Sequence, residues 1–430
     1  MSDLAPGEAT PPPGASSSSA VSASHSGPAP HPHVTSAAEE RRALIVLLTV
    51  IYLMIAGFGL VIPLLPFFAQ AFDAPAWQVT LLFSAFSLGQ FIGEPFWGKL
   101  SDRIGRRPVL IVTISMVGLS YAALAFAPNI LWAFGLRFLT GIFAGNISTL
   151  QGALADITPP EKRAQRMGIM GAAFSAGFMT GPAIGGLLAQ PGRGALGFQL
   201  PLLAAAAFAL ASAVAVVLLV RESRPEGPPA IRGPKPARVR DAFAHPVISR
   251  VVMISFIVVV GFAGIEATYG LWTETRFGWG PKQIGFAFMG IGVLGAVCQG
   301  WLSGRLARTF GEATTLTAGL VLMGVGLVTQ GASPTWQVAV LGFGLVCVGQ
   351  SICFPNVAAL ISQSSPPHRQ GEMLGLNMSG MALARIGGPV LAGQLFSAVS
   401  PGSPFAFSAL LVLPALWFAL QVRGKVQRLA

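Results

Sequence analysis

Long apolar runs dominate the chain from residue 43 onward, and short polar segments separate them. A helix rises about 1.5 Å per residue, so a run of about 20 residues crosses the roughly 30 Å hydrocarbon core of a bilayer. We therefore predict an all-α integral membrane protein with about twelve spanning helices. The predicted spans are 43–68, 78–101, 108–127, 130–155, 166–190, 199–220, 248–273, 283–305, 313–332, 335–362, 371–397 and 404–422.

The composition supports a membrane protein and excludes a soluble one. Of the 430 residues, 53% are hydrophobic and 10% are charged, whereas roughly a quarter are charged in a soluble domain. The net charge of +11 does not indicate nucleic-acid binding, because the basic residues form short clusters between the apolar runs. We expect the lipid bilayer, and no nucleic acid, as the environment of this surface.

The distribution of basic residues predicts the orientation. If the N-terminus is cytoplasmic, 22 of the 27 arginine and lysine residues fall on the cytoplasmic side, and only Arg193, Arg276 and Lys282 fall outside. This asymmetry is what the positive-inside rule requires. We expect a multi-pass protein of a bacterial inner membrane with both termini in the cytoplasm.

Two polar segments divide the chain. Residues 1–40, which include His25, His31 and His33, are rich in Ala, Ser, Pro and Gly and are expected to form a disordered cytoplasmic tail. Residues 221–247 are basic and Pro-rich, and we interpret them as a cytoplasmic linker. The linker separates a six-helix bundle at 41–220 from a second one at 248–422, and residues 423–430 form a short C-terminal tail.

The two halves are related by an internal repeat. A shift of about 207 positions superimposes Pro159-Pro160 on Pro366-Pro367 and Gly181-Pro182 on Gly388-Pro389. Small residues every fourth position also coincide, and such spacing places them on one stripe of a helix, where a neighbouring backbone can approach closely. Duplicated bundles that flank a central cavity are typical of secondary transporters.

One loop carries a specific motif. Residues 98–107, GKLSDRIGRR, join the second and third apolar runs, and 304–311, GRLARTFG, is a degenerate copy in the second half. The loop resembles the signature of the major facilitator superfamily. Residues 137–141 (RFLTG) resemble a further element of that family, and 177–186 (GFMTGPAIGG) resemble the Gly-Pro motif of its drug:proton antiporters. Residues 57–66 resemble the first helix of its twelve-span drug and tetracycline efflux group.

The resemblance implies the two-bundle fold of that family and assigns roles to the motif residues. It implies a cytoplasmic gate at Gly98, Asp102, Arg103, Gly105 and Arg106. It also implies a hinge or seal in the fifth helix, at Gly177, Gly181, Pro182, Gly185 and Gly186. Helix packing alone accounts for this second set equally well.

Four ionisable residues lie inside apolar runs: Glu94, Arg137, Glu266 and Arg385. Each costs roughly 2.5–3.5 kcal/mol at the bilayer centre on insertion scales, so each needs a partner or a watery cavity. We expect Glu266 to be the proton-coupling acid. Glu94 is the second candidate, and a structural pair with a loop arginine is an equally good interpretation of it. Arg137 and Arg385 are expected to be charge partners or substrate contacts, with Arg385 pairing with Glu266.

These features favour a proton-coupled exporter of small hydrophobic or amphiphilic compounds such as drugs, with an aromatic cavity formed by Phe67, Phe68, Phe83, Phe86, Trp272 and Phe354. An importer or facilitator of a polar metabolite is the alternative, and a membrane-embedded enzyme is a distant one, since the spans contain no histidine. The predicted first helix lacks the acid expected of tetracycline exporters, so tetracycline is not implied as the substrate. We expect no metal, no cofactor, no enzymatic activity and a monomeric protein whose partners are its small-molecule substrate and protons.

Overall fold

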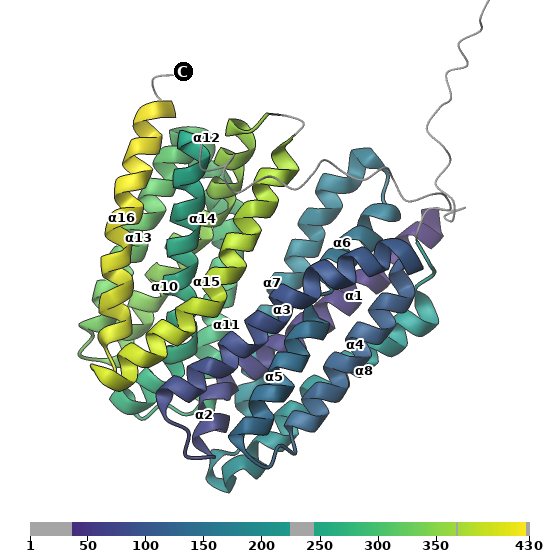
Figure 1. Cartoon of the computed structure of the whole chain (residues 1–430), viewed down its shortest axis with the longest axis horizontal. Coiled ribbons are helices and arrows are strands. Elements are labelled where there is room, and N and C mark those ends of the chain that lie inside the picture. Colours follow the sequence, from purple (N-terminus) through teal and green to yellow (C-terminus); the bar gives the residue numbers. More distant parts are fainter. Residues whose placement is uncertain (1–36, 224–244, 367–368, 427–430) are drawn as a thin grey trace, which may run out of the picture.

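The computed structural model describes residues 37–223, 245–366 and 369–426, and the secondary structure of these residues is helical (Figure 1). The N-terminal bundle consists, in chain order, of α1 (Ala37–Val61), η1 (Ile62–Leu64), α2 (Leu65–Gln70), α3 (Ala76–Ile104), α4 (Arg106–Leu124), α5 (Ile130–Ala144), α6 (Ile147–Asp156), η2 (Pro160–Lys162), α7 (Arg163–Leu188), η3 (Pro191–Phe198) and α8 (Gln199–Leu219).

The C-terminal bundle repeats this plan. It consists of α10 (Pro246–Phe277), α11 (Pro281–Val297), the π-helical turn η4 (Cys298–Leu302), α12 (Ser303–Phe310), α13 (Glu312–Gly331), α14 (Trp336–Ser364), α15 (Gln370–Ala398) and α16 (Ser403–Val426). The repeat extends to backbone geometry. Gly105 directly precedes α4 and has φ +107°, and Gly311 directly precedes α13 and has φ +80°. Residues with a side chain disfavour these φ values.

Ten segments within the described residues are long and apolar enough to cross a membrane. Two further helices of 29 residues each, α3 and α15, complete a set of twelve. These two are less apolar because they contain residues such as Glu94 and Arg385, and they pack against each other between the bundles instead of facing lipid alone. The predicted all-α architecture with about twelve spanning helices is confirmed.

Close backbone contacts fix the helix pairs inside each bundle. A Cβ atom added to Gly93 of α3 would lie 2.1 Å from the carbonyl oxygen of Ile142 of α5. In the second bundle, a Cβ atom on Gly349 of α14 would lie 2.5 Å from the carbonyl oxygen of Gly319 of α13. Small residues let these helices pack at backbone distance, and van der Waals contact of this kind drives association in lipid, where the hydrophobic effect between helices is weak.

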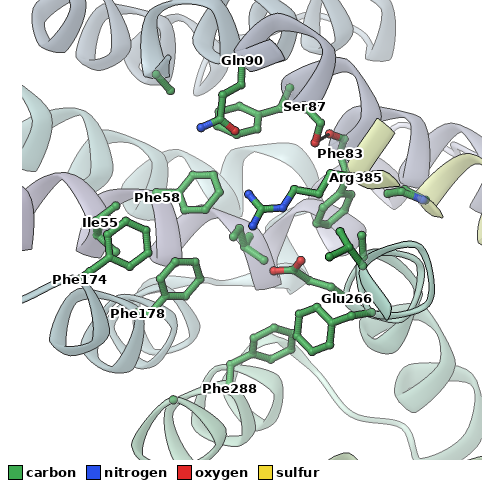
Figure 2. Close-up of a pocket in the computed structure, with 18 of the residues that line it drawn as sticks. Ile55, Phe58, Phe83, Ser87, Gln90, Phe174, Phe178, Glu266, Phe288 and Arg385 are labelled. Atoms are coloured by element: carbon green, nitrogen blue, oxygen red, sulfur yellow. Dashed lines mark hydrogen bonds between the residues drawn. The ribbon is translucent and has the colours of Figure 1, made fainter. Parts of the chain in front are cut away.

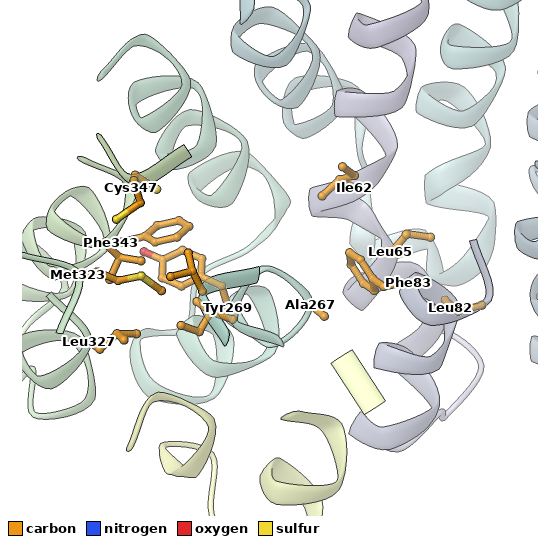
Figure 3. Packing of buried hydrophobic residues seen from close by; sticks show 14 of the residues in the cluster. Ile62, Leu65, Leu82, Phe83, Ala267, Tyr269, Met323, Leu327, Phe343 and Cys347 are labelled. Carbon is orange, nitrogen blue, oxygen red and sulfur yellow. The ribbon is translucent and has the colours of Figure 1, made fainter. Parts of the chain in front are cut away.

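The two bundles meet at one end and part at the other. In Figure 1 they converge near α2 and diverge toward the end of the molecule that carries the C-terminus. The helix pairs α3–α15 and α7–α11 make most of the contact. A buried hydrophobic cluster spans both bundles, with Ile62 and Leu82 on one side and Tyr269 and Phe343 on the other (Figure 3). We call the end near α2 the closed end, and the end that carries the α3–α4 turn the loop end.

Parts of three predicted segments lie outside the described residues. They are residues 1–36 of the N-terminal tail, residues 224–244 of the linker and residues 427–430 of the C-terminal tail. The three tail histidines belong to the first of these. The division of the chain at the linker stays a prediction.

Candidate functional site: a central cavity between the bundles

A cavity of about 290 Å³ lies between the two bundles, around the middle of the long helices. Helices α1, α3, α4, α5 and α7 line it from one bundle, and α10, α11, α14 and α15 line it from the other. Its walls are largely apolar, with a few polar side chains. The polar and charged lining residues are Ser87, Gln90, Tyr121, Arg137, Glu266, Gln350 and Arg385. Concave apolar sites with a few polar groups are typical of small-molecule binding.

Phenylalanine rings form much of the cavity wall. Phe58 and Phe178 pack edge to face with ring centroids 5.8 Å apart, and Phe174 stacks on Phe178 at 5.6 Å. Figure 2 shows these rings together with Phe83 and Phe288 around one space. A flat aromatic molecule would meet ring faces and edges on several sides, an arrangement that aromatic groups favour.

The aromatic prediction is half right. Phe83, Phe86 and Phe354 line the cavity as expected. Phe67, Phe68 and Trp272 do not, because they point into the hydrophobic core and are 6%, 2% and 2% exposed. The cavity is also lined by phenylalanines that were not predicted: Phe58, Phe174, Phe178, Phe262, Phe288 and Phe343. The available signal was the i, i+4 spacing of Phe174 and Phe178 in α7, at the start of the Gly-Pro motif 177–186, which we call the helix-five motif because it lies in the fifth span.

Glu266 and Arg385 reach the cavity from neighbouring helices of the second bundle. Glu266 lies on α10 and is half-buried, whereas Arg385 lies on α15 and is exposed to the cavity. The two side chains point toward one another (Figure 2), and the charge of Arg385 acts on Glu266. No direct ion pair joins them within the described structure, and neither has a hydrogen bond there. The expected pairing is therefore electrostatic and spans a gap.

Glu94 occupies a different position from Glu266. It lies on α3 beside Pro95, is half-buried and is not part of the cavity lining. The cation that acts on it is Arg385, not an arginine of the loop. Arg385 therefore influences both candidate carboxyl groups, one in each bundle.

Arg137 is a buried cation at the cavity wall. It is 1% exposed, and its guanidinium carbon lies 4.5 Å from the centroid of the Phe86 ring. The guanidinium also interacts with the hydroxyl group of Tyr121. Its Nε and Nη1 atoms have no hydrogen-bond partner in the described part of the chain. Cation–π contact and the tyrosine dipole thus take the place of a carboxylate.

The loop motif forms an ionic network at the loop end. Arg106 binds the Asp102 carboxylate at 2.6 Å and the Asp156 carboxylate at 3.2 Å. It also donates a hydrogen bond of 2.7 Å to the hydroxyl group of Ser101. Its guanidinium packs on Gly152, where a Cβ atom would lie 2.8 Å from the guanidinium carbon. Arg106 therefore ties α3 to α6, and Asp156 is a network member that the sequence analysis missed.

Glu222 is a second missed member. Its carboxylate accepts hydrogen bonds from the backbone N–H groups of Arg106 at 2.8 Å and Arg107 at 3.1 Å, which are the first residues of α4. A carboxylate at a helix N-terminus accepts hydrogen bonds from N–H groups that have no partner in the helix, and its negative charge is stabilised by the positive end of the helix dipole. A Cβ atom on Gly105 would lie 2.3 Å from Glu222 Oε2. The glycine therefore serves both the positive φ and the space for this carboxylate.

The helix-five motif makes two kinds of contact. Gly181 and Gly185 face α1, where added Cβ atoms would lie 2.3 Å from Ala56 O and 2.4 Å from Leu60 O. Gly186 faces the other bundle, and its Cβ atom would lie 2.6 Å from the carbonyl oxygen of Pro281. The motif therefore packs helices within its bundle and also forms part of the closed end. Gly98 and Gly177 pack within the N-terminal bundle, against Ser148 and α1 respectively.

Comparison with known proteins agrees with this architecture. The profile of the Major Facilitator Superfamily matches residues 47–321 and 274–428. The class C tetracycline resistance protein of Escherichia coli is 30% identical over 371 residues, which are 84% of this chain and 91% of that protein. The quinolone resistance protein NorA of Staphylococcus aureus (strain MSSA476) is 27% identical over 348 residues, 80% of this chain and 88% of that protein.

Solved structures show the same fold. The human organic anion transporter MFSD10 is 26% identical with a TM-score of 0.65, over 88% of this chain and 99% of that one. A bacterial homologue of the human lysosomal transporter Spinster, in its inward-facing and occupied conformation, has a TM-score of 0.76 at 15% identity, over 90% of this chain and 97% of that one. The chain is a multi-pass membrane protein that belongs to the Major Facilitator Superfamily.

Proposed function

We propose that this transporter exports small aromatic, amphiphilic compounds in exchange for protons. The observation that carries the proposal is Glu266, a carboxyl group that faces an aromatic cavity between two bundles. The names of relatives point the same way, since they denote tetracycline resistance, quinolone resistance and organic anion transport. We place the loop end in the cytoplasm, so that the cavity faces the cytoplasm when the closed end is sealed.

The proposed exchange rests on competition at one carboxyl group. An ionised Glu266 attracts the polar or cationic part of a compound, whereas a protonated Glu266 does not. A proton that arrives from outside therefore releases the compound there, and loss of that proton to the cytoplasm restores the site. A proton that crosses 100 mV yields about 2.3 kcal/mol, which supports a concentration ratio of roughly 50-fold.

Two ionisable side chains lie near Glu266. Arg385 is the cation that acts on it, and Cys347 is a further titratable neighbour. Glu94 is the reserve candidate because the same arginine acts on it. The loop motif (98–107) would then control opening of the loop end through the Arg106 network. The helix-five motif would control opening of the closed end through the contact of Gly186 with Pro281.

Proteoliposomes with an internal pH-sensitive dye test this proposal. A proton gradient is imposed, aromatic test compounds are added, and wild type is compared with the variants Glu266→Gln and Glu94→Gln. Asp73→Asn serves as control, because Asp73 is an exposed carboxylate outside the cavity and Asn tolerates its φ of +57°. We expect compound-dependent proton flux in wild type and the control, and its loss in Glu266→Gln.

Other outcomes separate the alternatives. Full flux in Glu266→Gln with loss in Glu94→Gln would move proton coupling to α3. Protons that move in the same direction as the compound would indicate an importer. Compound movement without proton movement would indicate a facilitator and would contradict the proposed exchange.

A further inference from the structure

The strongest unexplained feature of the cavity is a pair of opposite charges that do not meet. Glu266 and Arg385 face one another (Figure 2), yet no ion pair joins them in the described structure. Arg385 is exposed and can keep its hydration, whereas the half-buried Glu266 loses part of its own, and the attraction between the two charges offsets that loss only at close contact. A cargo that bridges the gap would recover this attraction.

The two helices that carry this pair cross at backbone contact. A Cβ atom on Gly388 of α15 would lie 2.5 Å from the carbonyl oxygen of Val260 of α10, and one on Gly264 would lie 3.1 Å from Gly388 O. This close crossing lies within one turn or two of both charged residues. The backbones are therefore already in contact near both residues, and the relative position of the two charged groups depends on their side chains.

Only one cation of the cavity is available to a cargo. Arg137 is 1% exposed and is engaged by the Phe86 ring and Tyr121, whereas Arg385 is exposed and makes no hydrogen bond or ion pair in the described part of the chain. Glu266 is the one carboxyl group among the lining residues. The accessible charges of the site are thus one of each sign.

This arrangement selects the charge of the cargo. A cation bound at Glu266 would place like charge near Arg385, and an anion bound at Arg385 would place like charge near Glu266. A zwitterion satisfies both groups and meets neither repulsion. Phe58, Phe178 and Phe288 surround the same space, so the body of the cargo would be aromatic.

We propose that the cavity binds small aromatic zwitterions, with the cationic group of the cargo at Glu266 and its anionic group at Arg385. This inference rests on the proposed function, since it names the compound class for the same cavity. It extends that function by making Arg385 a substrate-binding residue and not only a counter-charge.

A matched set of three fluorescent probes tests the proposal. Nε-dansyl-lysine carries an α-ammonium group and a carboxylate on an aromatic body. Its methyl ester keeps only the cation, and its Nα-acetyl derivative keeps only the anion. Binding to the full chain in lipid nanodiscs is measured from dansyl fluorescence, for wild type, Arg385→Gln, Glu266→Gln and Arg193→Gln. Arg193 is exposed in η3, outside the cavity, and serves as the matched control.

We expect wild type and the control to bind dansyl-lysine about tenfold or more tightly than either derivative, as is typical when a charged hydrogen-bond partner is lost. Arg385→Gln should remove the preference over the methyl ester and leave ester binding unweakened. Glu266→Gln should remove the preference over the acetyl derivative.

Three results would overturn the proposal: equal binding of ester and zwitterion by wild type, equal weakening of all three probes by Arg385→Gln, or no probe bound by folded protein. Proton flux is not part of this measurement. Zwitterion selectivity without proton flux would leave this inference standing and contradict the proposed exchange. Proton-coupled export without charge selectivity would do the reverse.

Discussion

Ser84 of α3 donates a hydrogen bond of 2.8 Å to the backbone carbonyl of Ile386 of α15, and this bond joins the two bundles directly beside Arg385. Ser84 is 4% exposed, so water does not compete for the bond. The bond lies where the closed end meets the cavity. The seal of the closed end therefore begins at the residue that follows the cavity arginine.

Replacement of Ser84 by Ala should weaken the seal. Loss of one net hydrogen bond costs about 0.5–1.5 kcal/mol, so the ratio of closed to open molecules at this end should fall roughly two- to tenfold. Spin labels at Gly192 and Ser400, one in each bundle near the closed end, would report the distribution of the distance between them by double electron–electron resonance. Ser212→Ala is the control, because that hydroxyl bonds within its own helix at 2.8 Å. A distribution unchanged by Ser84→Ala would contradict a role in sealing.

Replacement of Gly393 by Ala should have a larger effect on the same end. An added Cβ atom would lie 1.9 Å from Thr80 Oγ1 and 3.0 Å from the Cα atom of Trp77, so α15 and α3 must separate. We expect the bundles to be separated at the closed end in most molecules, which the same spin labels would detect. Transport should fall as well, which a flux assay would detect. Gly387→Ala lies on the same helix with nothing within 4 Å of its Cβ atom and should behave as wild type. Equal effects of the two substitutions would argue for a loss of helix flexibility instead.

Helix positions could be predicted because lipid imposes a simple rule on the sequence. A span must be predominantly apolar over about 20 residues, so boundaries such as those of α4 and α13 follow from hydropathy to within a few residues. The break between α5 and α6 was not predicted, because 130–155 has the length and the predominantly apolar composition of a single span despite Arg137 and Asn146. Its causes are tertiary: Gly145 packs on the backbone of Glu94, and Asn146 donates to the Thr113 hydroxyl at 2.9 Å.

The site was only partly predictable for a related reason. Glu266 and Arg385 stood out because a charge in a span is costly. The aromatic lining did not, because the apolar run 43–68 carries almost no facial pattern, and nothing in it says that Phe58 faces the cavity while Phe67 faces the core. Glu222 was missed because its partner Arg106 lies 116 positions away in the sequence.

Replacement of Arg106 by Lys should impair transport although the charge is kept. The guanidinium binds two carboxylates and Ser101 at once, and a lysine ammonium cannot reproduce that planar geometry. If the network holds the loop end, the variant should populate a different ratio of conformations and lose at least half of its transport rate. The control is Arg308→Lys, an arginine of the second-half copy of the motif, whose side chain donates a hydrogen bond to Gly304 of its own helix. Flux and labels across the loop end check the result, and equal loss in both variants would contradict a special role for Arg106.

Replacement of Gly105 by Ala should destabilise the N-terminal bundle more than the equivalent change at Gly311. Both glycines have φ and ψ values that are almost restricted to glycine, φ +107° and ψ 159° against φ +80° and ψ 156°, so each alanine costs about 1–3 kcal/mol of strain. At Gly311 nothing lies within 4 Å of the added Cβ atom, whereas at Gly105 it meets the Glu222 carboxylate at 2.3 Å.

The difference between the two variants should therefore measure the Glu222 contact. Displacing that carboxylate also removes its two hydrogen bonds to the start of α4, which adds roughly 1–3 kcal/mol for the pair. Thermal unfolding in detergent should show a lower midpoint for Gly105→Ala than for Gly311→Ala. In the background of Glu222→Ala the clash is gone, so the two glycine substitutions should then cost about the same. A Gly105→Ala cost that stays larger without Glu222 would mean that backbone strain alone separates the two halves.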